Sequence, residues 1–344
     1  MQTAGLLDLQ VNGFAGVDFN QTGLTAEALE HALRAMLATG VTSCLPTLIT
    51  APEDVMAARL AALDRAVSGS RLARLMVPGY HLEGPFLNPA PGYAGCHPPA
   101  AMKLPDPGLL SRLAAGLERP VLLLTLAPER PGAVDLIRWA HKRGILVAIG
   151  HAAADAASVT AAADAGARMS THLGNALPQM QPKFLSPLMA QLAEDRLAAS
   201  FIADGIHIPP PALKVLLRAK GLERSVLVTD ATAGAAAPPG VFGFASMAIE
   251  RAADGSVRAA GTERLAGSGL CLDQAVRNLV AWGIAPAETA LRLASDQPAS
   301  LIASALAAHG VRLAAGSVTW SSEIYPELVR LDGIELRLRR DQPG

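Results

Sequence analysis

Short apolar runs, most of them followed by a turn signal, recur eight times along this chain and are separated by alanine-rich segments with helical spacing. Such runs predict buried strands, and the spacing of the intervening segments predicts amphipathic helices. Strand–helix alternation repeated eight times is typical of an α/β protein whose parallel sheet closes into a (β/α)8 TIM-like barrel. The alternative is an open, doubly wound sheet. The predicted barrel strands are Leu6–Val11, Ser43–Leu48, Leu75–Leu82, Val121–Leu126, Ile145–Ile149, Arg168–Thr171, Ala199–Ile202 and Ser225–Val228.

The remaining segments carry signals of their own. Thr25 and Pro52 provide a capping oxygen and a first-turn proline for two predicted helices. After Asp230 the alternation gives way to a Pro- and Gly-rich stretch, a hairpin around Asp254-Gly255 and short strands in the tail. The predicted helices are Thr25–Ala38, Pro52–Val67, Gly132–Lys142, Pro210–Lys220, Leu270–Trp282 and Ala287–Ala294; the later strands are Ala245–Arg251, Ser256–Ala260, Val318–Trp320, Leu328–Leu331 and Ile334–Leu338.

Histidine and acidic residues stand at the ends of several predicted strands. Glu83, His151 and His172 follow three of them, and a metal site at the mouth of a parallel barrel needs such residues at successive strand ends. His81 shares one face of its strand with Glu83, because the strand period is two. Two imidazoles and one carboxylate suit a catalytic Zn²⁺ with an open position for water. Singly, each histidine is more often a core or surface residue, and Glu83 could instead cap the next element. The set as a whole favours the metal site, and with it the barrel.

Asp230 ends the eighth predicted strand, where its carboxylate would face the barrel axis. Such a group can accept the proton of an attacking water and later pass it to a leaving group. The alternative role, capping a following helix, is disfavoured by the Pro/Gly-rich loop that comes next. His31, His141 and His309 lie on helical or loop segments, and we interpret them as solvated.

Composition excludes several function classes. Basic and acidic residues are interspersed and the net charge is −1, so no electrostatic footprint for nucleic acid or an anionic membrane is visible. Cys44, Cys96 and Cys271 are odd in number and outside any C-x-x-C pattern, which predicts reduced thiols in a cytoplasmic protein. We expect neither a signal peptide nor a membrane span, because Asp8 interrupts the first apolar residues and no charge-free apolar stretch reaches about 18 residues.

Seven short motifs occur in a fixed order along the chain. They are Asp8-Leu9-Gln10-Val11-Asn12-Gly13, Leu45-Pro46-Thr47-Leu48-Ile49-Thr50, His81-Leu82-Glu83-Gly84-Pro85-Phe86, Thr171-His172-Leu173-x-Asn175-Ala176, Ala203-Asp204-Gly205-Ile206-His207, Leu227-Val228-Thr229-Asp230-Ala231-Thr232 and Val276-Arg277-Asn278-Leu279-Val280. Over about residues 6–300, this arrangement resembles the N-acetylglucosamine-6-phosphate deacetylases of the amidohydrolase superfamily.

The resemblance implies one divalent metal ion per subunit, Zn²⁺ or else Fe²⁺ or another ion, and a homodimer. It implies Glu83, His151 and His172 as metal ligands. It also implies Asp230 as the catalytic acid/base and His97 as the residue that polarises the substrate carbonyl. The substrate-contacting positions that it implies are Cys96, His97, Asn175, Ala176, Lys183, His207, Leu265, Ala266 and Gly267.

Some positions depart from the family or the wider superfamily. Gln10 and Asn12 stand where the superfamily has a His-x-His pair for a second metal, and neutral amides bind Zn²⁺ poorly beside imidazole, which agrees with one ion. Ala152 replaces a serine beside His151. Lys183 aligns with the arginine that clamps the sugar phosphate, and lysine lacks the bidentate fork of arginine. The family also has chain ahead of its first barrel strand, so we expect its small β-sandwich to be reduced or rebuilt from residues 310–344.

We therefore expect residues 5–305 to form the barrel and 306–344 to form a β-strand remnant of the small domain. The expected reaction releases acetate from N-acetylglucosamine 6-phosphate. The alternatives are deacetylation of N-acetylgalactosamine 6-phosphate or an unphosphorylated hexosamine, hydrolysis of a cyclic amide or N-acyl amino acid, and sugar binding without catalysis. A pure binder has no need of Asp230. Pro178–Pro187, rich in Pro, Gln and Met, is expected to form the dimer contact or, alternatively, a flexible active-site loop.

Overall fold

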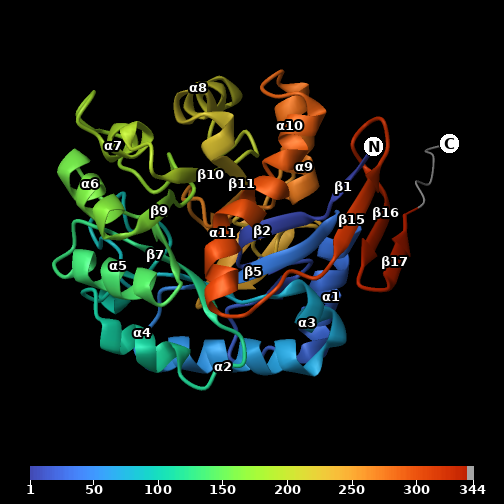
Figure 1. The fold of residues 1–344 in the computed structure, drawn as a ribbon, viewed down its shortest axis with the longest axis horizontal. Helices are drawn as coiled ribbons and strands as arrows, with labels where there is room; N and C mark the ends of the chain where they lie inside the picture. Colours follow the sequence, from blue (N-terminus) through green and yellow to red (C-terminus); the bar gives the residue numbers. More distant parts are fainter. Residues whose placement is uncertain (339–344) are drawn as a thin grey trace.

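The computed structural model describes residues 1–338; the end of the predicted C-terminal segment, residues 339–344, lies outside the described part. Eight parallel strands form one sheet in the order β11-β10-β9-β8-β7-β6-β5-β2, which confirms the predicted (β/α)8 barrel. Figure 1 shows the helices arranged around this sheet. The barrel strands are β2 (Leu6–Val11), β5 (Val41–Ile49), β6 (Tyr80–Glu83), β7 (Val121–Leu126), β8 (Leu146–Ile149), β9 (Ala167–Ser170), β10 (Ala198–Ile202) and β11 (Ser225–Val228).

One predicted strand is wrong over half its length. Leu75–Leu82 was expected to be extended, but Arg71–Met76 forms helix α3 and strand β6 begins at Tyr80. The Ser70 side chain caps this helix by accepting a hydrogen bond from the Ala73 amide, and its apolar residues pack on the barrel. A short apolar run is compatible with either structure, and here the capping serine decides the outcome.

The helices follow the predicted alternation. Thr25 caps α1 by accepting from the Ala28 amide, as expected. Lys220, at the end of α8, is buried, and its Nζ donates to the carbonyls of Gln191 (2.9 Å) and Glu194 (2.8 Å) at the end of α7. The helices are α1 (Ala26–Ala38), α2 (Glu53–Gly69), α3 (Arg71–Met76), α4 (Pro107–Ala114), α5 (Ala133–Lys142), α6 (Ala156–Ala165), α7 (Pro187–Ala193), α8 (Pro210–Lys220), α9 (Leu272–Ala281), α10 (Ala287–Arg292) and α11 (Asp296–Ala308).

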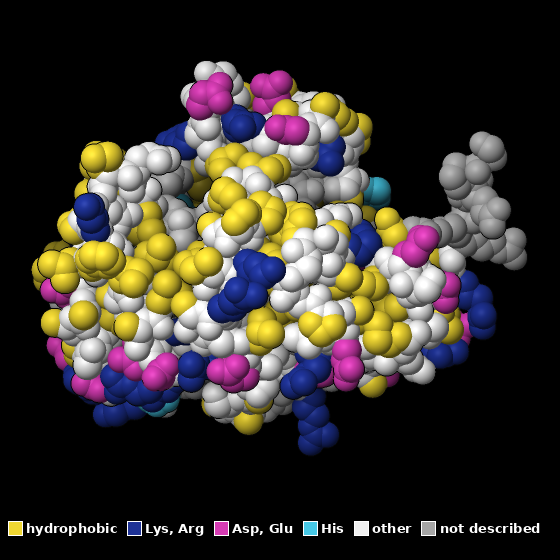
Figure 2. Space-filling view, turned by 90° about the horizontal axis from the view of Figure 1, so that it is seen from above, with side chains coloured by type: hydrophobic (Ala, Val, Ile, Leu, Met, Phe, Trp, Pro, Cys, Tyr) yellow, Lys and Arg dark blue, Asp and Glu magenta, His cyan; other side chains and the backbone are white. Residues whose placement is uncertain are grey.

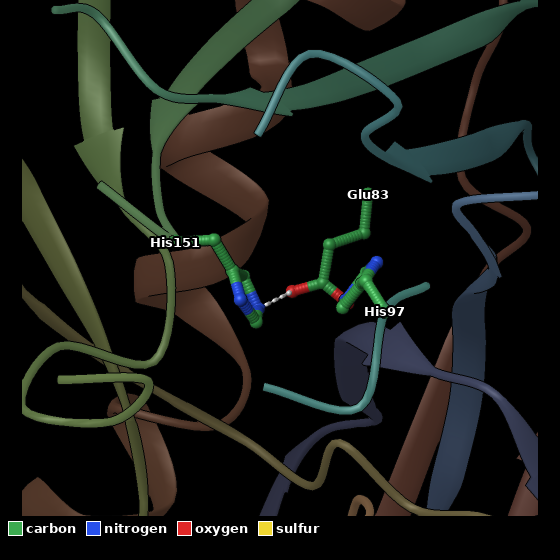
Figure 3. Close-up of side chains that lie close together, drawn as sticks. All are labelled: Glu83, His97 and His151. Carbon is green, nitrogen blue, oxygen red and sulfur yellow. Dashed lines mark ion pairs between the residues drawn. The ribbon is translucent and has the colours of Figure 1, made fainter. Parts of the chain in front are cut away.

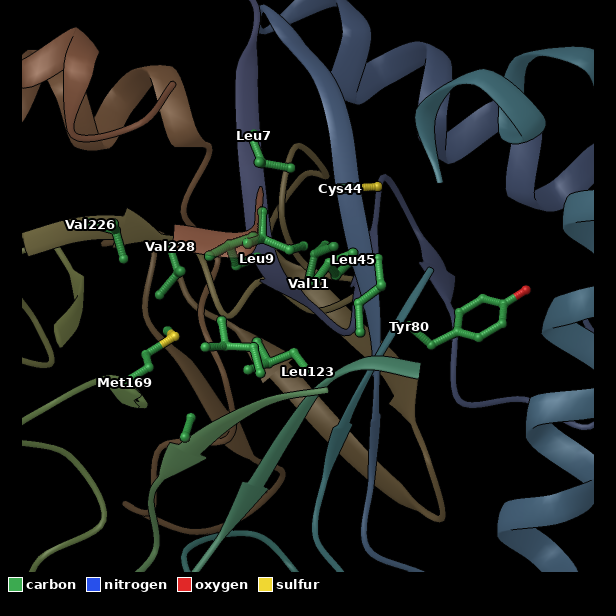
Figure 4. Packing of buried hydrophobic residues seen from close by; sticks show 14 of the residues in the cluster. Leu7, Leu9, Val11, Cys44, Leu45, Tyr80, Leu123, Met169, Val226 and Val228 are labelled. Atoms are coloured by element: carbon green, nitrogen blue, oxygen red, sulfur yellow. The ribbon is translucent and has the colours of Figure 1, made fainter. Parts of the chain in front are cut away.

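The barrel interior is filled by apolar side chains from successive strands. Leu9, Leu45, Leu123 and Val228 are fully buried, and Figure 4 shows them converging with their neighbours inside the sheet. Burying one such side chain contributes about 1.5–3 kcal/mol. The barrel is therefore a packed core, and its chemistry is confined to the mouth.

The boundary between the first barrel strand, β2, and the last, β11, is called the seam here. The hydrogen bonds along the seam differ between its two ends. At the mouth, the Asp230 amide donates to the Gln10 carbonyl (2.9 Å), which joins the strand ends directly. At the opposite end, the Leu7 and Leu227 amides each donate over 2.8 Å to carbonyls of segment 293–294. The link between α10 and α11 thus lies between β2 and β11 there, and direct pairing resumes near the mouth.

A buried carboxyl group supports this seam. Asp8 accepts hydrogen bonds from the Thr229 amide (3.2 Å) and the Thr229 hydroxyl (2.6 Å) across it. Burial raises the pKa of Asp8 to about 7. The side chain of one strand therefore takes the place of a backbone acceptor for the other.

The two ends of the described chain share a small antiparallel sheet. Strand β1 (Gln2–Ala4) pairs with β15 (Gly316–Trp320), which is followed by β16 (Pro326–Leu331) and β17 (Ile334–Arg337). The indole of Trp320 packs over Gly40 and donates to the Thr3 hydroxyl (2.8 Å). The predicted tail strands are confirmed, whereas the exact division at residues 305 and 306 stays a prediction.

A second small sheet lies beyond the barrel. It consists of β12 (Gly240–Phe244), β13 (Met247–Arg251) and β14 (Val257–Ala259), and its last two strands form the predicted hairpin. Strands β3 (Gly13–Phe14) and β4 (Val17–Asp18) form one short antiparallel pair.

The surface agrees with the balanced composition. On the face drawn in Figure 2, acidic and basic side chains are interspersed. Within residues 1–338, none of the helices combines the length and apolar character needed to cross a membrane. The three cysteines are free thiols, and His31, His141 and His309 are exposed, as predicted.

Candidate active site at the barrel mouth

Three of the predicted site residues have the same backbone conformation at the same position after a barrel strand. His151, His172 and Asp230 each stand two residues beyond the end of a barrel strand, and their φ angles are 51°, 30° and 51°. Non-glycine residues adopt this left-handed conformation at a cost of about 1–3 kcal/mol, and such strain is concentrated at functional sites. Because this conformation recurs two residues after each of these strands, it brings the three polar side chains together at the barrel mouth.

The Glu83 carboxylate is the centre of the site. It lies 2.9 Å from His172 Nε2, 3.4 Å from His151 Nε2 and 3.4 Å from His97 Nε2. Figure 3 shows it between the imidazoles of His97 and His151. Burial opposes ionisation of Glu83, but the surrounding histidines hold the pKa of this carboxyl well below its usual range.

These side chains could hold a metal ion. One ligand atom from each of Glu83, His97 and His151 lies within 4.8 Å of the others, and all three residues are buried. His172 reaches the same carboxylate, so the predicted ligand set of Glu83, His151 and His172 also converges there. Nitrogen and oxygen donors in this mixture suit Zn²⁺ and other divalent transition metals.

The hydrogen bonds of the Nδ1 atoms, on the side of each ring away from Glu83, distinguish His97 from His151. His151 Nδ1 lies 2.8 Å from the Tyr93 carbonyl, which accepts only, so Nδ1 carries the proton and Nε2 offers a lone pair towards Glu83. His97 Nδ1 instead accepts from the Thr50 amide (3.3 Å). Burial lowers the pKa of His97 to about 4, so the ring is neutral and its proton is on Nε2. His151 is thus prepared to bind a metal, and His97 to donate a hydrogen bond.

The side-chain amides of Gln10 and Asn12 bind Asp230, and that of Gln10 also binds the Glu83 carboxylate. Asn12 Nδ2 donates to Asp230 Oδ1 over 2.7 Å, and Gln10 Nε2 donates to both Asp230 Oδ1 (3.2 Å) and Glu83 Oε1 (2.9 Å). Burial and the Glu83 charge raise the pKa of Asp230 to about 6. A carboxyl group that titrates near neutrality suits general acid–base chemistry.

A cavity of about 140 Å³ contains most of the predicted substrate positions. Lys183 is exposed and does not line it, and Ala266 is buried behind its wall. His207 is held by a hydrogen bond between its Nδ1 and Asp204 Oδ2 (2.6 Å). The cavity is lined by Asn12, Ile49, Glu83, Gly95, Cys96, His97, His151, His172, Asn175, Ala176, Ile202, His207, Asp230, Phe244, Leu265 and Gly267.

Several functional contacts were not foreseen. Gln10 and Asn12 were interpreted as lost metal ligands, although their spacing of two at a strand end already places both side chains on one face. The carbonyl of Tyr93 has no sequence signal as a histidine partner. His81 lies beneath the site, where its ring contacts the hydroxyls of Thr47 (3.2 Å) and Thr125 (2.8 Å).

Comparisons with known proteins agree with this geometry, although a scan against protein-family models gives no match. The N-acetylglucosamine-6-phosphate deacetylase of Bos taurus is 35% identical over 311 residues, covering 87% of this chain and 73% of the relative. The N-acetylgalactosamine-6-phosphate deacetylase of Escherichia coli O157:H7 is 33% identical over 298 residues, covering 86% and 76%.

A solved structure gives the same result in three dimensions. A variant of N-acetyl-D-glucosamine-6-phosphate deacetylase from Mycobacterium smegmatis, in complex with N-acetyl-D-glucosamine-6-phosphate, superposes with a TM-score of 0.85 at 30% identity. The match covers 97% of this chain and 86% of the other. This chain therefore belongs to the N-acetylglucosamine-6-phosphate deacetylase family of amidohydrolase enzymes.

Proposed function

We propose that this enzyme removes the acetyl group from an N-acetylhexosamine 6-phosphate, with N-acetylglucosamine 6-phosphate as the first candidate substrate. The observation that supports this most strongly is the convergence of Glu83, His151 and His172 beside Asp230. An amide is unreactive towards water at neutral pH, so its hydrolysis needs an activated nucleophile, a stabilised oxyanion and a proton for the amine. The site contains a candidate for each requirement.

Glu83, His151 and His172 would hold one divalent ion, and we propose Zn²⁺. When bound, the ion supplies Lewis-acid activation of water and of the amide carbonyl. Asp230 would accept the water proton on its carboxylate and later deliver it to the departing amine. His97 Nε2–H would donate to the substrate carbonyl oxygen, where negative charge develops. Asn175 and His207 would orient the sugar.

A deacetylation panel tests this proposal. Acetate release is measured with N-acetylglucosamine 6-phosphate, N-acetylgalactosamine 6-phosphate and the corresponding neutral sugars, together with the metal content of the protein. Asp230→Asn should abolish turnover and leave metal content intact. Near-normal activity in this variant would refute the assigned chemistry.

N-acetylgalactosamine 6-phosphate is the second candidate substrate. It is favoured because the Escherichia coli O157:H7 relative bears that name at an identity close to that of the Bos taurus relative. The two sugars differ in the orientation of one hydroxyl, so the same catalytic groups serve both. A ratio of kcat/KM values from the panel decides between them.

We also propose that the enzyme is a cytoplasmic homodimer. Segment Pro178–Pro187 exposes Met180 (89%), Phe184 (79%) and Leu185 (86%), an apolar surface that a second copy would cover. Light scattering at micromolar concentration should give twice the subunit mass. Phe184→Asp should shift the protein to the monomer, whereas a single-subunit mass for the unmodified protein would refute the proposal.

A further inference from the structure

Arg264 stands in a second cavity that adjoins the reaction cavity. This outer cavity, of about 570 Å³, shares Gly95, His97, Ala176 and Leu265 with the inner one. At about 140 Å³ the inner cavity is below the range of roughly 300–1,000 Å³ that small-molecule sites usually have. An acetamido group at Asp230 would therefore leave the rest of its sugar projecting outwards.

Arg264 is the one Lys or Arg among residues 1–338 that lines either cavity. Its guanidinium has no carboxylate within ion-pair distance in this part of the chain, unlike Arg112, Arg196 or Arg277. It donates from Nη1 to the Gly95 carbonyl (3.3 Å). Its remaining donors are available, and a guanidinium fork matches phosphate bidentately.

The hydrogen bond to the Gly95 carbonyl holds the Arg264 guanidinium beside the residues of the candidate active site. A Cβ on Gly95 would lie 2.9 Å from His151 Cε1, so this residue packs against the imidazole on one side and supports Arg264 on the other. The neighbouring acid, Glu263, also lines the outer cavity, but its side chain is 99% exposed, lies 3.6 Å from Arg258 and makes no ion pair with Arg264.

We propose that the outer cavity receives the phosphorylated end of the substrate and that Arg264, from the same subunit, is the cation that binds the phosphate. This inference rests on the proposed function and refines it. It differs from the assignment implied by the family resemblance, in which Lys183 takes this role: both residues are exposed, but Lys183 lines neither cavity, whereas Arg264 lines the outer one. The specificity for a phosphosugar would then be built into a single chain.

Steady-state kinetics of Arg264→Met, with the 6-phosphorylated and neutral sugars, test the proposal. Losing a charged hydrogen-bonding pair should lower kcat/KM for the phosphosugar by about 10- to 100-fold, mainly through KM, and change the neutral sugar by less than about twofold. Arg264→Lys should recover part of the loss. Arg112→Met is the matched control, because it removes an exposed arginine on α4 that lines neither cavity.

A binding measurement separates failure of this inference from failure of the proposed function. Calorimetry with glucosamine 6-phosphate should show binding that Arg264→Met weakens and Arg112→Met preserves, whether or not acetate is released. An equal loss for both sugars, or a phosphate-specific loss in Lys183→Met instead, overturns the assignment to Arg264. If the unmodified protein neither releases acetate nor binds the phosphosugar, both the function and the inference are wrong.

Discussion

Removing the Asn12 amide should move the acid limb of the pH–activity profile. In the proposed mechanism Asp230 acts as the base only when ionised, so the rate should fall as the pH drops through the pKa of this carboxyl, which burial and Glu83 raise to about 6. The 2.7 Å hydrogen bond from Asn12 stabilises the ionised form. In Asn12→Ala this stabilisation is lost, and the limb should move to higher pH.

The size of the displacement follows from the contacts. A hydrogen bond to a charged group contributes about 1.5–3 kcal/mol, and 1.36 kcal/mol corresponds to about one pH unit. Gln10 still donates to the same oxygen over 3.2 Å and retains part of the effect. We therefore expect a displacement of about one pH unit.

The assay is log(kcat/KM) against pH from about 4.5 to 9, with metal content measured in parallel. Gln274→Ala, which removes an exposed amide on α9, is the control and should leave the profile unchanged. An unchanged acid limb in Asn12→Ala, at full metal occupancy, would refute the role of this amide in setting the ionisation of Asp230.

Three further results follow. Gly95→Ala should weaken metal binding by about 10- to 100-fold, since its Cβ would displace the His151 ring; a chelator titration measures this, and unaltered affinity would contradict the packing. Lys220→Met removes the side-chain donor to the buried Gln191 carbonyl and one of two donors to the Glu194 carbonyl, which keeps the Leu197 amide, and should lower the free energy of unfolding by about 1–3 kcal/mol in urea. Between pH 4 and 7 the folded state keeps a proton on Asp8 that the unfolded chain has released, so this carboxyl makes stability fall as pH rises; Asp8→Asn should remove that contribution and shift the slope of stability against pH in the positive direction, and equal slopes in both proteins would disprove it.

The barrel and the inner site were predictable because their signals are local. An apolar run with a polar residue at its end marks both a strand and the side chain that the strand carries to the mouth, as for Glu83 and His151. The contacts that tune these residues are not local. The Tyr93 carbonyl meets an imidazole 58 positions away, and Arg264 reaches a carbonyl 169 positions away. Nothing in a single sequence identifies such pairs.

The hydrogen bond that closes the barrel at its mouth, from the Asp230 amide to the Gln10 carbonyl, involves a residue of the candidate active site. Because the Asp230 amide is itself part of the seam, a sub-global opening that parts β2 from β11 would also move Asp230, the proposed acid/base, away from Glu83. The region resisting such an opening is small, since further down segment 293–294 separates the strands. Heating should then abolish turnover reversibly before the helices melt, with the Asp230 amide exchanging its hydrogen earlier than amides of central strand β7. The working temperature of this enzyme would be set by one local opening and not by the stability of the whole barrel.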